Sequence, residues 1–174
     1  MKWLILFVSF FVGVANAKNL TVYFSVTGNT QKVANIVHSV VGGDIRRIEP
    51  VNEYPHEYEI ISGMVKNEKL NELRPEYKDM KINWSEYDTV YIGYPLWFGQ
   101  MPRIVYGFLE NNDFAGKTIV PFNTHGGSGR GDTDEVIRKM LPRSKVVGGL
   151  AVMGNDSSEE QTEAVKHWLE EIDF

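Results

Sequence analysis

Three hydroxyl side chains, a glycine and an asparagine stand between a short apolar run and a helical pattern near the start of the chain. Positions 25–30 read Ser-Val-Thr-Gly-Asn-Thr. A helix N-terminus presents free N–H groups with a partial positive charge, and neighbouring hydroxyls donate further hydrogen bonds to an anion. Because the loop holds no Lys or Arg, a terminal monophosphate fits it better than a triphosphate with magnesium. Ordinary helix capping is the alternative. The residues assigned to this phosphate site are Ser25, Thr27, Gly28, Asn29 and Thr30.

A second loop carries adjacent aromatic residues between a proline and a glycine. Positions 95–99 read Pro-Leu-Trp-Phe-Gly. A Trp-Phe pair is costly to expose on a solvated loop. A planar aromatic ligand that stacks on the indole explains the pair, and the alternative is that both rings tuck into the core beneath the loop. The residues assigned to this ring site are Pro95, Leu96, Trp97 and Phe98.

A third loop is rich in glycine. Positions 123–129 read Asn-Thr-His-Gly-Gly-Ser-Gly, which exposes backbone N–H groups to the polar edge of a flat heterocycle. His125 either hydrogen-bonds the ligand, donates a proton or faces water as a turn residue. The other three histidines are predicted outside the site, in spacings that match no metal motif. The residues assigned to this loop are Thr124, His125, Gly126, Gly127 and Gly129.

Alternating strand and helix patterns position these loops. Five strands separated mostly by helices predict an α/β fold with a doubly wound parallel sheet. Ligands bind such sheets beyond the carboxyl ends of the strands, where the three loops meet. The predicted strands cover 20–25, 44–48, 88–93, 117–122 and 146–153, and the predicted helices cover 28–41, 102–109, 132–141 and 157–172, with a further helix at 56–73 in the long connection 49–87.

Composition limits the classes of protein. The chain has 174 residues, no cysteine and a formal net charge of −5. It therefore has no disulfide framework or thiolate ligand, and it lacks the basic balance that nucleic-acid binding requires. Residues 1–17 combine a Lys, a short apolar run and an Ala-x-Ala site, as in a secretory signal peptide. We therefore expect an exported protein, with one domain at 18–174 and no stable membrane span after cleavage.

The three loops together resemble those of the flavodoxin family, and the resemblance covers essentially the mature chain. It implies a three-layer α/β/α fold with strand order 2-1-3-4-5 and non-covalently bound FMN. Residues 25 and 27–30 would hold the FMN phosphate, residues 95–98 would flank the isoalloxazine ring, and residues 124–127 and 129 would line its polar edge. Flavodoxins that carry electrons in the cytosol commonly stack a Tyr from the loop after strand four, whereas positions 123–132 hold no Tyr.

The resemblance implies electron transfer to a redox partner protein or a small-molecule acceptor. The two ring loops contain no Lys or Arg, so we expect a low potential for the last reduction step, which suits a one-electron carrier. Arg103 and Arg130 lie just outside these loops, close enough in sequence to reach a reduced flavin. The alternative is an FMN-dependent NAD(P)H:quinone, nitro or azo reductase with His125 or Tyr94 as proton donor. A third possibility is a binding module that has lost FMN.

Overall fold

The computed structural model describes residues 18–172. The predicted signal peptide lies outside these residues. The described chain forms one parallel sheet with strand order β2-β1-β3-β4-β5, and β6 also pairs with β4. The predicted α/β class and the strand order 2-1-3-4-5 are therefore confirmed. The strands are β1 (Asn19–Tyr23), β2 (Asp44–Arg47), β3 (Thr89–Pro95), β4 (Thr118–His125), β5 (Lys145–Val146) and β6 (Leu150–Met153).

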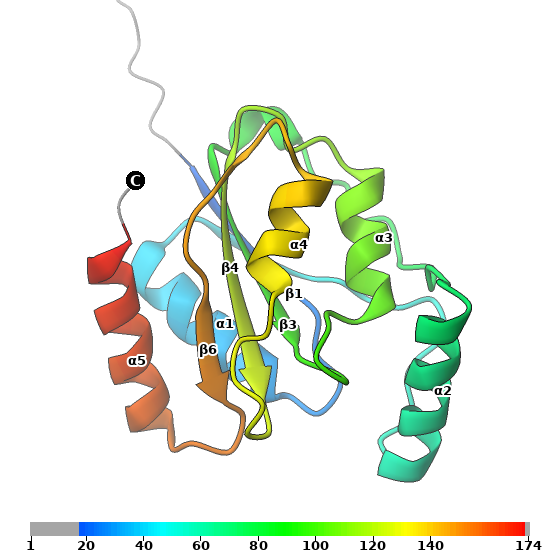
Figure 1. Cartoon of the computed structure of the whole chain (residues 1–174). Coiled ribbons are helices and arrows are strands. Elements are labelled where there is room, and N and C mark those ends of the chain that lie inside the picture. The colour runs from blue at the N-terminus through cyan, green and yellow to red at the C-terminus, as the bar shows by residue number, and fades with distance from the viewer. Residues whose placement is uncertain (1–17, 173–174) are drawn as a thin grey trace, which may run out of the picture.

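Helices cover both faces of the sheet (Figure 1). On one face Val33 of α1 and Trp168 of α5 pack in a core cluster with Val120 of β4. On the other face Phe108 of α3 and Ile137 of α4 belong to a second cluster. Residues of the strands point alternately to these two clusters, as the two-residue period of a strand requires. These helices are α1 (Asn29–Val41), α3 (Arg103–Asn111), α4 (Thr133–Met140) and α5 (Ser158–Glu171).

The single strand predicted at 146–153 is interrupted. Its two parts, β5 and β6, pair with successive parts of β4, and Pro121 of β4 lies between those parts. Val147 still donates its N–H to the carbonyl of Ile119, but proline has no N–H with which to continue the ladder. Gly149 instead donates its N–H to the Asp134 carboxylate at 2.9 Å. The edge strand therefore leaves β4 for a few residues and rejoins it.

The connection between β2 and β3 holds the predicted helix, shortened to α2 (Tyr58–Leu70). Within α2 only Val65 and Glu68 are buried. The chain then returns as an extended segment that ends in a 3-10 turn at Trp84–Glu86. Side chains of this segment pack against the core cluster of α3, so α2 itself lies to one side of the sheet (Figure 1). The packed residues of the segment are Tyr77, Met80, Ile82 and Trp84.

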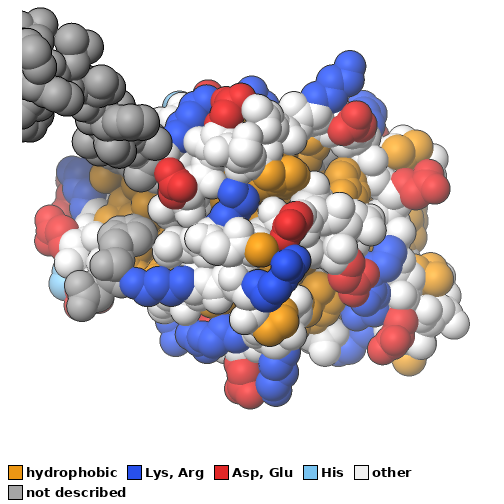
Figure 2. Space-filling model, turned by 90° about the horizontal axis from the view of Figure 1, so that it is seen from above, with side chains coloured by type: hydrophobic (Ala, Val, Ile, Leu, Met, Phe, Trp, Pro, Cys, Tyr) orange, Lys and Arg blue, Asp and Glu red, His pale blue; other side chains and the backbone are white. Residues whose placement is uncertain are grey.

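Charged side chains gather at the amino edge of the sheet. Lys18 lies 2.9 Å from Asp44, and Arg143 lies 3.1 Å from Asp113. Figure 2 looks onto this edge and shows basic and acidic side chains interspersed there. No helix in the described range 18–172 is long and apolar enough to cross a membrane.

Candidate functional site

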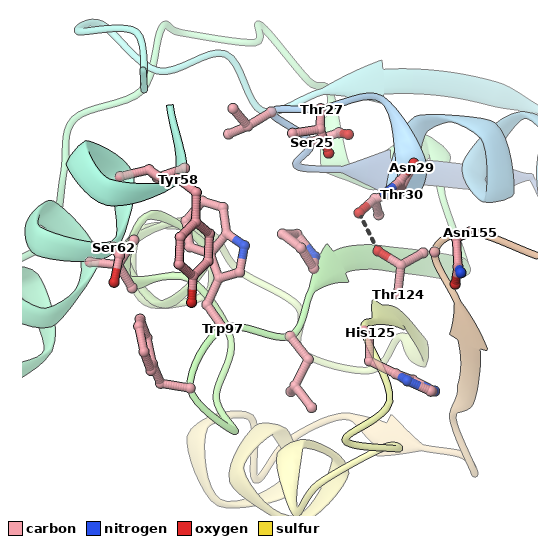
Figure 3. A pocket seen from close by; sticks show the side chains of 18 of the residues that line it. Ser25, Thr27, Asn29, Thr30, Tyr58, Ser62, Trp97, Thr124, His125 and Asn155 are labelled. Atoms are coloured by element: carbon pink, nitrogen blue, oxygen red, sulfur yellow. Dashed lines mark hydrogen bonds between the residues drawn. The ribbon is translucent and has the colours of Figure 1, made fainter. Parts of the chain in front are cut away.

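A cavity of about 570 Å³ opens where the strands end. This volume lies within the usual range for small-molecule sites. Its walls come from the loops after β1, β3, β4 and β6 and from one face of α2 (Figure 3). Among residues 18–172, no Lys, Arg, Asp or Glu lines it. The predicted site residues that line the cavity are Ser25, Thr27, Asn29, Thr30, Pro95, Leu96, Trp97, Phe98, Thr124, His125 and Gly126.

The first loop leaves the start of α1 open toward the cavity. Gly28 takes the left-handed conformation with φ 89°, and it is the N-cap residue without any side-chain cap. Its own N–H is occupied, because it donates to Ser25 Oγ at 3.1 Å. The first backbone bond of the helix runs from the Lys32 N–H to the Gly28 carbonyl. The N–H groups of residues 29–31 precede that bond and stay available to an anion.

Buried hydroxyls stand beside these N–H groups. Ser25, Thr30 and Thr124 are all buried although each lines the cavity. The Oγ1 atoms of Thr30 and Thr124 lie 2.8 Å apart, so one hydroxyl donates to the other (Figure 3). The accepting hydroxyl keeps its own proton for a ligand. The guanidinium of Arg47 in β2 donates to the Ser25 carbonyl at 3.1 Å and so stabilises the loop after β1.

The aromatic loop combines the two arrangements considered for it. One part of the Trp97 ring packs against the core, with its centroid 5.6 Å from the rings of both Phe24 and Tyr54. The same side chain lines the cavity. Phe98 is 46% exposed, with φ 48°, and Lys66 Nζ lies 5.3 Å from its ring centroid. Trp97 is thus fixed by the core on one side and presented to the cavity on the other.

The glycine-rich loop fixes the tautomer of one histidine. The Gly127 N–H donates to His125 Nδ1 at 3.0 Å. A neutral His125 therefore carries its proton on Nε2. Gly127 and Gly129 have positive φ values of 120° and 73°. These two glycines and Gly28 shape their loops without lining the cavity.

Three sequence-based expectations about neighbouring residues change. Tyr94 is fully buried and donates its hydroxyl to Thr133 Oγ1 at 2.9 Å, away from the cavity, and burial raises its pKa above the ordinary value. It is therefore unsuited as a proton donor to a bound ligand. Arg103 and Arg130 are also engaged elsewhere, with the Leu73 and Gly149 carbonyls. Neither arginine lines the cavity.

Sequence reasoning missed the wall formed by α2 and the last loop. His56 was expected outside the site but lines the cavity, so His125 is not the sole histidine there. The helical spacing of 58, 61 and 65 indicated a common face, but not that this face lines the cavity. Residues 18–172 contain no cluster of His, Asp or Glu able to hold a metal ion. The lining residues missed are Val26, His56, Tyr58, Ile61, Ser62, Val65, Met153, Gly154 and Asn155.

Comparison with known proteins agrees with this architecture. A candidate flavoprotein from Bacteroides eggerthii is 34% identical, with 89% of this chain and 97% of that chain covered and a TM-score of 0.74. A second, from Bacteroides uniformis, is 32% identical, with 89% and 99% covered and a TM-score of 0.75. A flavoprotein from Lactobacillus acidophilus, solved in complex with FMN, is 20% identical and shares the fold with a TM-score of 0.67. The match covers 84% of this chain and 99% of that chain.

No curated protein matches the chain. The family model described as Flavodoxin matches residues 18–172, which is the whole described domain. Taken with the strand order and the relatives above 30% identity, this match identifies the chain as a member of the flavodoxin family.

Proposed function

We propose that this protein binds FMN non-covalently in the cavity and transfers electrons through it. The observation that carries the proposal is the open N-terminus of α1, beside three buried hydroxyls, at one end of a cavity whose other end presents Trp97. A phosphate group suits the first end because the N–H and hydroxyl groups there all donate. A flat ring suits the second end. The donor set and the aromatic wall thus match the two ends of FMN.

Bound FMN would supply the one- and two-electron redox chemistry, and the protein would tune it. Ser25, Thr27 and Thr30 would hold the phosphate together with the N–H groups of α1. Trp97 would position the ring, and the Nε2 proton of His125 would be available to a ring heteroatom. Because no charged residue among 18–172 lines the cavity, negative charge gained on reduction would meet no cation in the cavity wall. This arrangement favours a low potential for the last reduction step.

An absorption spectrum and a redox titration of the purified protein test the proposal. We expect bound flavin and two separate one-electron reduction steps. The potential of the second step should lie well below the corresponding potential of free FMN. A colourless protein that takes up no FMN on mixing would contradict FMN binding. A flavin with the potential of free FMN and a single two-electron step would contradict the electron-carrier role.

His125 gives a reason to consider a second function. Its Nε2 proton lies on a cavity-lining side chain, as a reductase needs for protonating a reduced substrate. An NAD(P)H-dependent quinone, nitro or azo reductase would reduce its substrate in steady state without a partner protein. Purified holoprotein that turns over NAD(P)H with such an acceptor would favour this reading over the electron carrier.

The site of action that we propose is outside the cytoplasm. The order of charge, apolar run and Ala-x-Ala at 1–17 supports export, and the partner would then be an exported redox protein or a small-molecule acceptor. N-terminal sequencing of the protein from the exported fraction should give Lys18 as the first residue. An uncut Met1 in the cytosolic fraction would contradict export.

A further inference from the structure

Helix α2 contributes little to the core of the domain. Of its 13 residues, only Val65 and Glu68 are buried. The sheet face beneath it is covered instead by the extended segment around Met80 and Trp84. Ile61 still packs against the core cluster on that face. One face of α2 also lines the cavity, with Tyr58, Ile61, Ser62 and Val65.

Tyr58 is the most exposed of these aromatic and apolar positions. Its side chain is 74% exposed although it lines the cavity. In Figure 3 it projects from the start of α2 on the side of the cavity where Trp97 also lies. Large exposed aromatic side chains beside a cavity signal a binding surface, because a planar ligand would remove their apolar area from water.

Two contacts hold α2 against the aromatic loop. Lys66 lies over the Phe98 ring, 5.3 Å from its centroid, and Lys69 Nζ donates to the Phe98 carbonyl at 3.4 Å. Tyr54, just before the helix, donates its hydroxyl to Glu68 of α2 at 3.2 Å and packs against Trp97. The helix that carries Tyr58 is thus linked to the loop that carries the Trp97 wall.

From these contacts we infer that Tyr58 contacts the isoalloxazine ring of bound FMN and partly shields it from small acceptors. Tyr58 would supply a second aromatic contact to the ring from α2, whereas positions 123–132 after β4 hold no Tyr. This inference rests on the proposed FMN binding. It also favours a protein partner over a small-molecule acceptor, because a covered ring is harder for a diffusing molecule to reach.

FMN affinity of four proteins tests this role: wild type, Tyr58→Ala, Tyr58→Phe and Ile60→Ala. Ile60 is a matched control, since it lies on the same helix, is 56% exposed and does not line the cavity. Fluorescence titration should show Tyr58→Ala weakened by about 2- to 13-fold, the range expected for one aromatic contact. Tyr58→Phe keeps the ring and should stay within about twofold of wild type. Riboflavin affinity should fall by the same factor as FMN affinity, because the contact is with the ring.

A second measurement follows electron exchange. Photoreduced Tyr58→Ala should be reoxidised by a soluble quinone faster than wild type, while Ile60→Ala should match wild type. Equal FMN affinity and equal reoxidation rates for Tyr58→Ala and Ile60→Ala would overturn the role of Tyr58. That result is distinguishable from failure of the proposed function, in which wild type itself would bind no FMN.

Discussion

The side-chain hydroxyls of Thr30 and Thr124 form a buried hydrogen bond of 2.8 Å between the first turn of α1 and the end of β4. This bond joins two of the three loops that sequence reasoning assigned to a ligand. It also sets how many hydroxyl protons remain for an anion, because each threonine has only one to donate.

Removing hydroxyls from the first loop should weaken contacts with the phosphate group of FMN and leave contacts with its ring unchanged. Each hydrogen bond to a charged group contributes about 1.5–3 kcal/mol. The double variant Thr27→Val, Thr30→Val should therefore bind FMN at least about tenfold more weakly, with riboflavin affinity unchanged. Ser39→Ala, at the exposed far end of the same helix, serves as the control. Unchanged FMN affinity in the double variant would rule out the assigned phosphate loop.

Truncating Trp97 should affect both flavins alike. The indole lines the cavity and has its centroid 5.6 Å from those of Phe24 and Tyr54. Trp97→Leu should weaken the binding of FMN and of riboflavin by the same factor. That factor corresponds to about 0.5–1.5 kcal/mol of lost stacking energy. Isothermal titration with each flavin measures this. A loss confined to FMN would show that the residue acts on the phosphate end instead.

The buried Glu68 should make stability depend on pH. Burial raises the pKa of this carboxyl above its ordinary value, and Arg103 opposes the shift. A raised pKa in the folded state favours the protonated form, so its contribution is present below the unfolded pKa and is lost as pH rises through the folded value. Glu68→Gln keeps an acceptor for the Tyr54 hydroxyl and removes the titration. Urea unfolding should show its stability relative to wild type increasing as pH rises above the ordinary pKa of a glutamate.

Glu110 provides a control of opposite sign. Its hydrogen bond with Arg74 lowers the pKa of the Glu110 carboxyl, so its contribution is present above the unfolded pKa and is lost as pH falls. Glu110→Gln should lose stability at neutral pH and little at acidic pH. Because the pair is partly exposed, the effect should stay below about 1 kcal/mol. Parallel pH profiles for the two variants would contradict the assigned causes.

A glycine in β3 is required by the ring opposite it. A Cβ at Gly93 would lie 2.2 Å from the Phe122 ring of β4. Gly93→Ala should therefore cost about 1–3 kcal/mol through overpacking. Gly63→Ala is the matched substitution in α2, where a Cβ meets open space, and it should stabilise by about 0.5–1 kcal/mol. Denaturant unfolding compares the two, and equal effects would contradict the steric account.

Sequence reasoning located the parts of the site that follow strands. Ser25 is the last residue of one predicted strand, and Trp97 and Thr124 lie just beyond the ends of two others. Parallel strands bring their carboxyl ends to one edge. Local patterns therefore sufficed to predict that these three residues share a cavity. The interruption at Gly149 was not predicted, because it depends on Pro121 and Asp134, which approach it only in the folded sheet.

That α2 lines the cavity could not be predicted from its own periodicity, for a similar reason. The periodicity around Tyr58 and Val65 indicates a helix with one apolar face, but the same pattern fits a helix packed on the sheet. Which face of the domain a helix covers depends on what else competes for that place. Here the segment containing Tyr77 and Trp84 takes the sheet surface, so α2 is left beside the cavity.

The marginal packing of α2 has a consequence for how ligand enters. A helix with two buried residues gives up little apolar contact when it separates locally from the domain, so its opening should require far less free energy than global unfolding. Amide hydrogens of α2 should then exchange with deuterium well before those of β3 and β4, and bound flavin should slow them. Local separation of α2 would then widen the entrance to the cavity while the sheet remains intact.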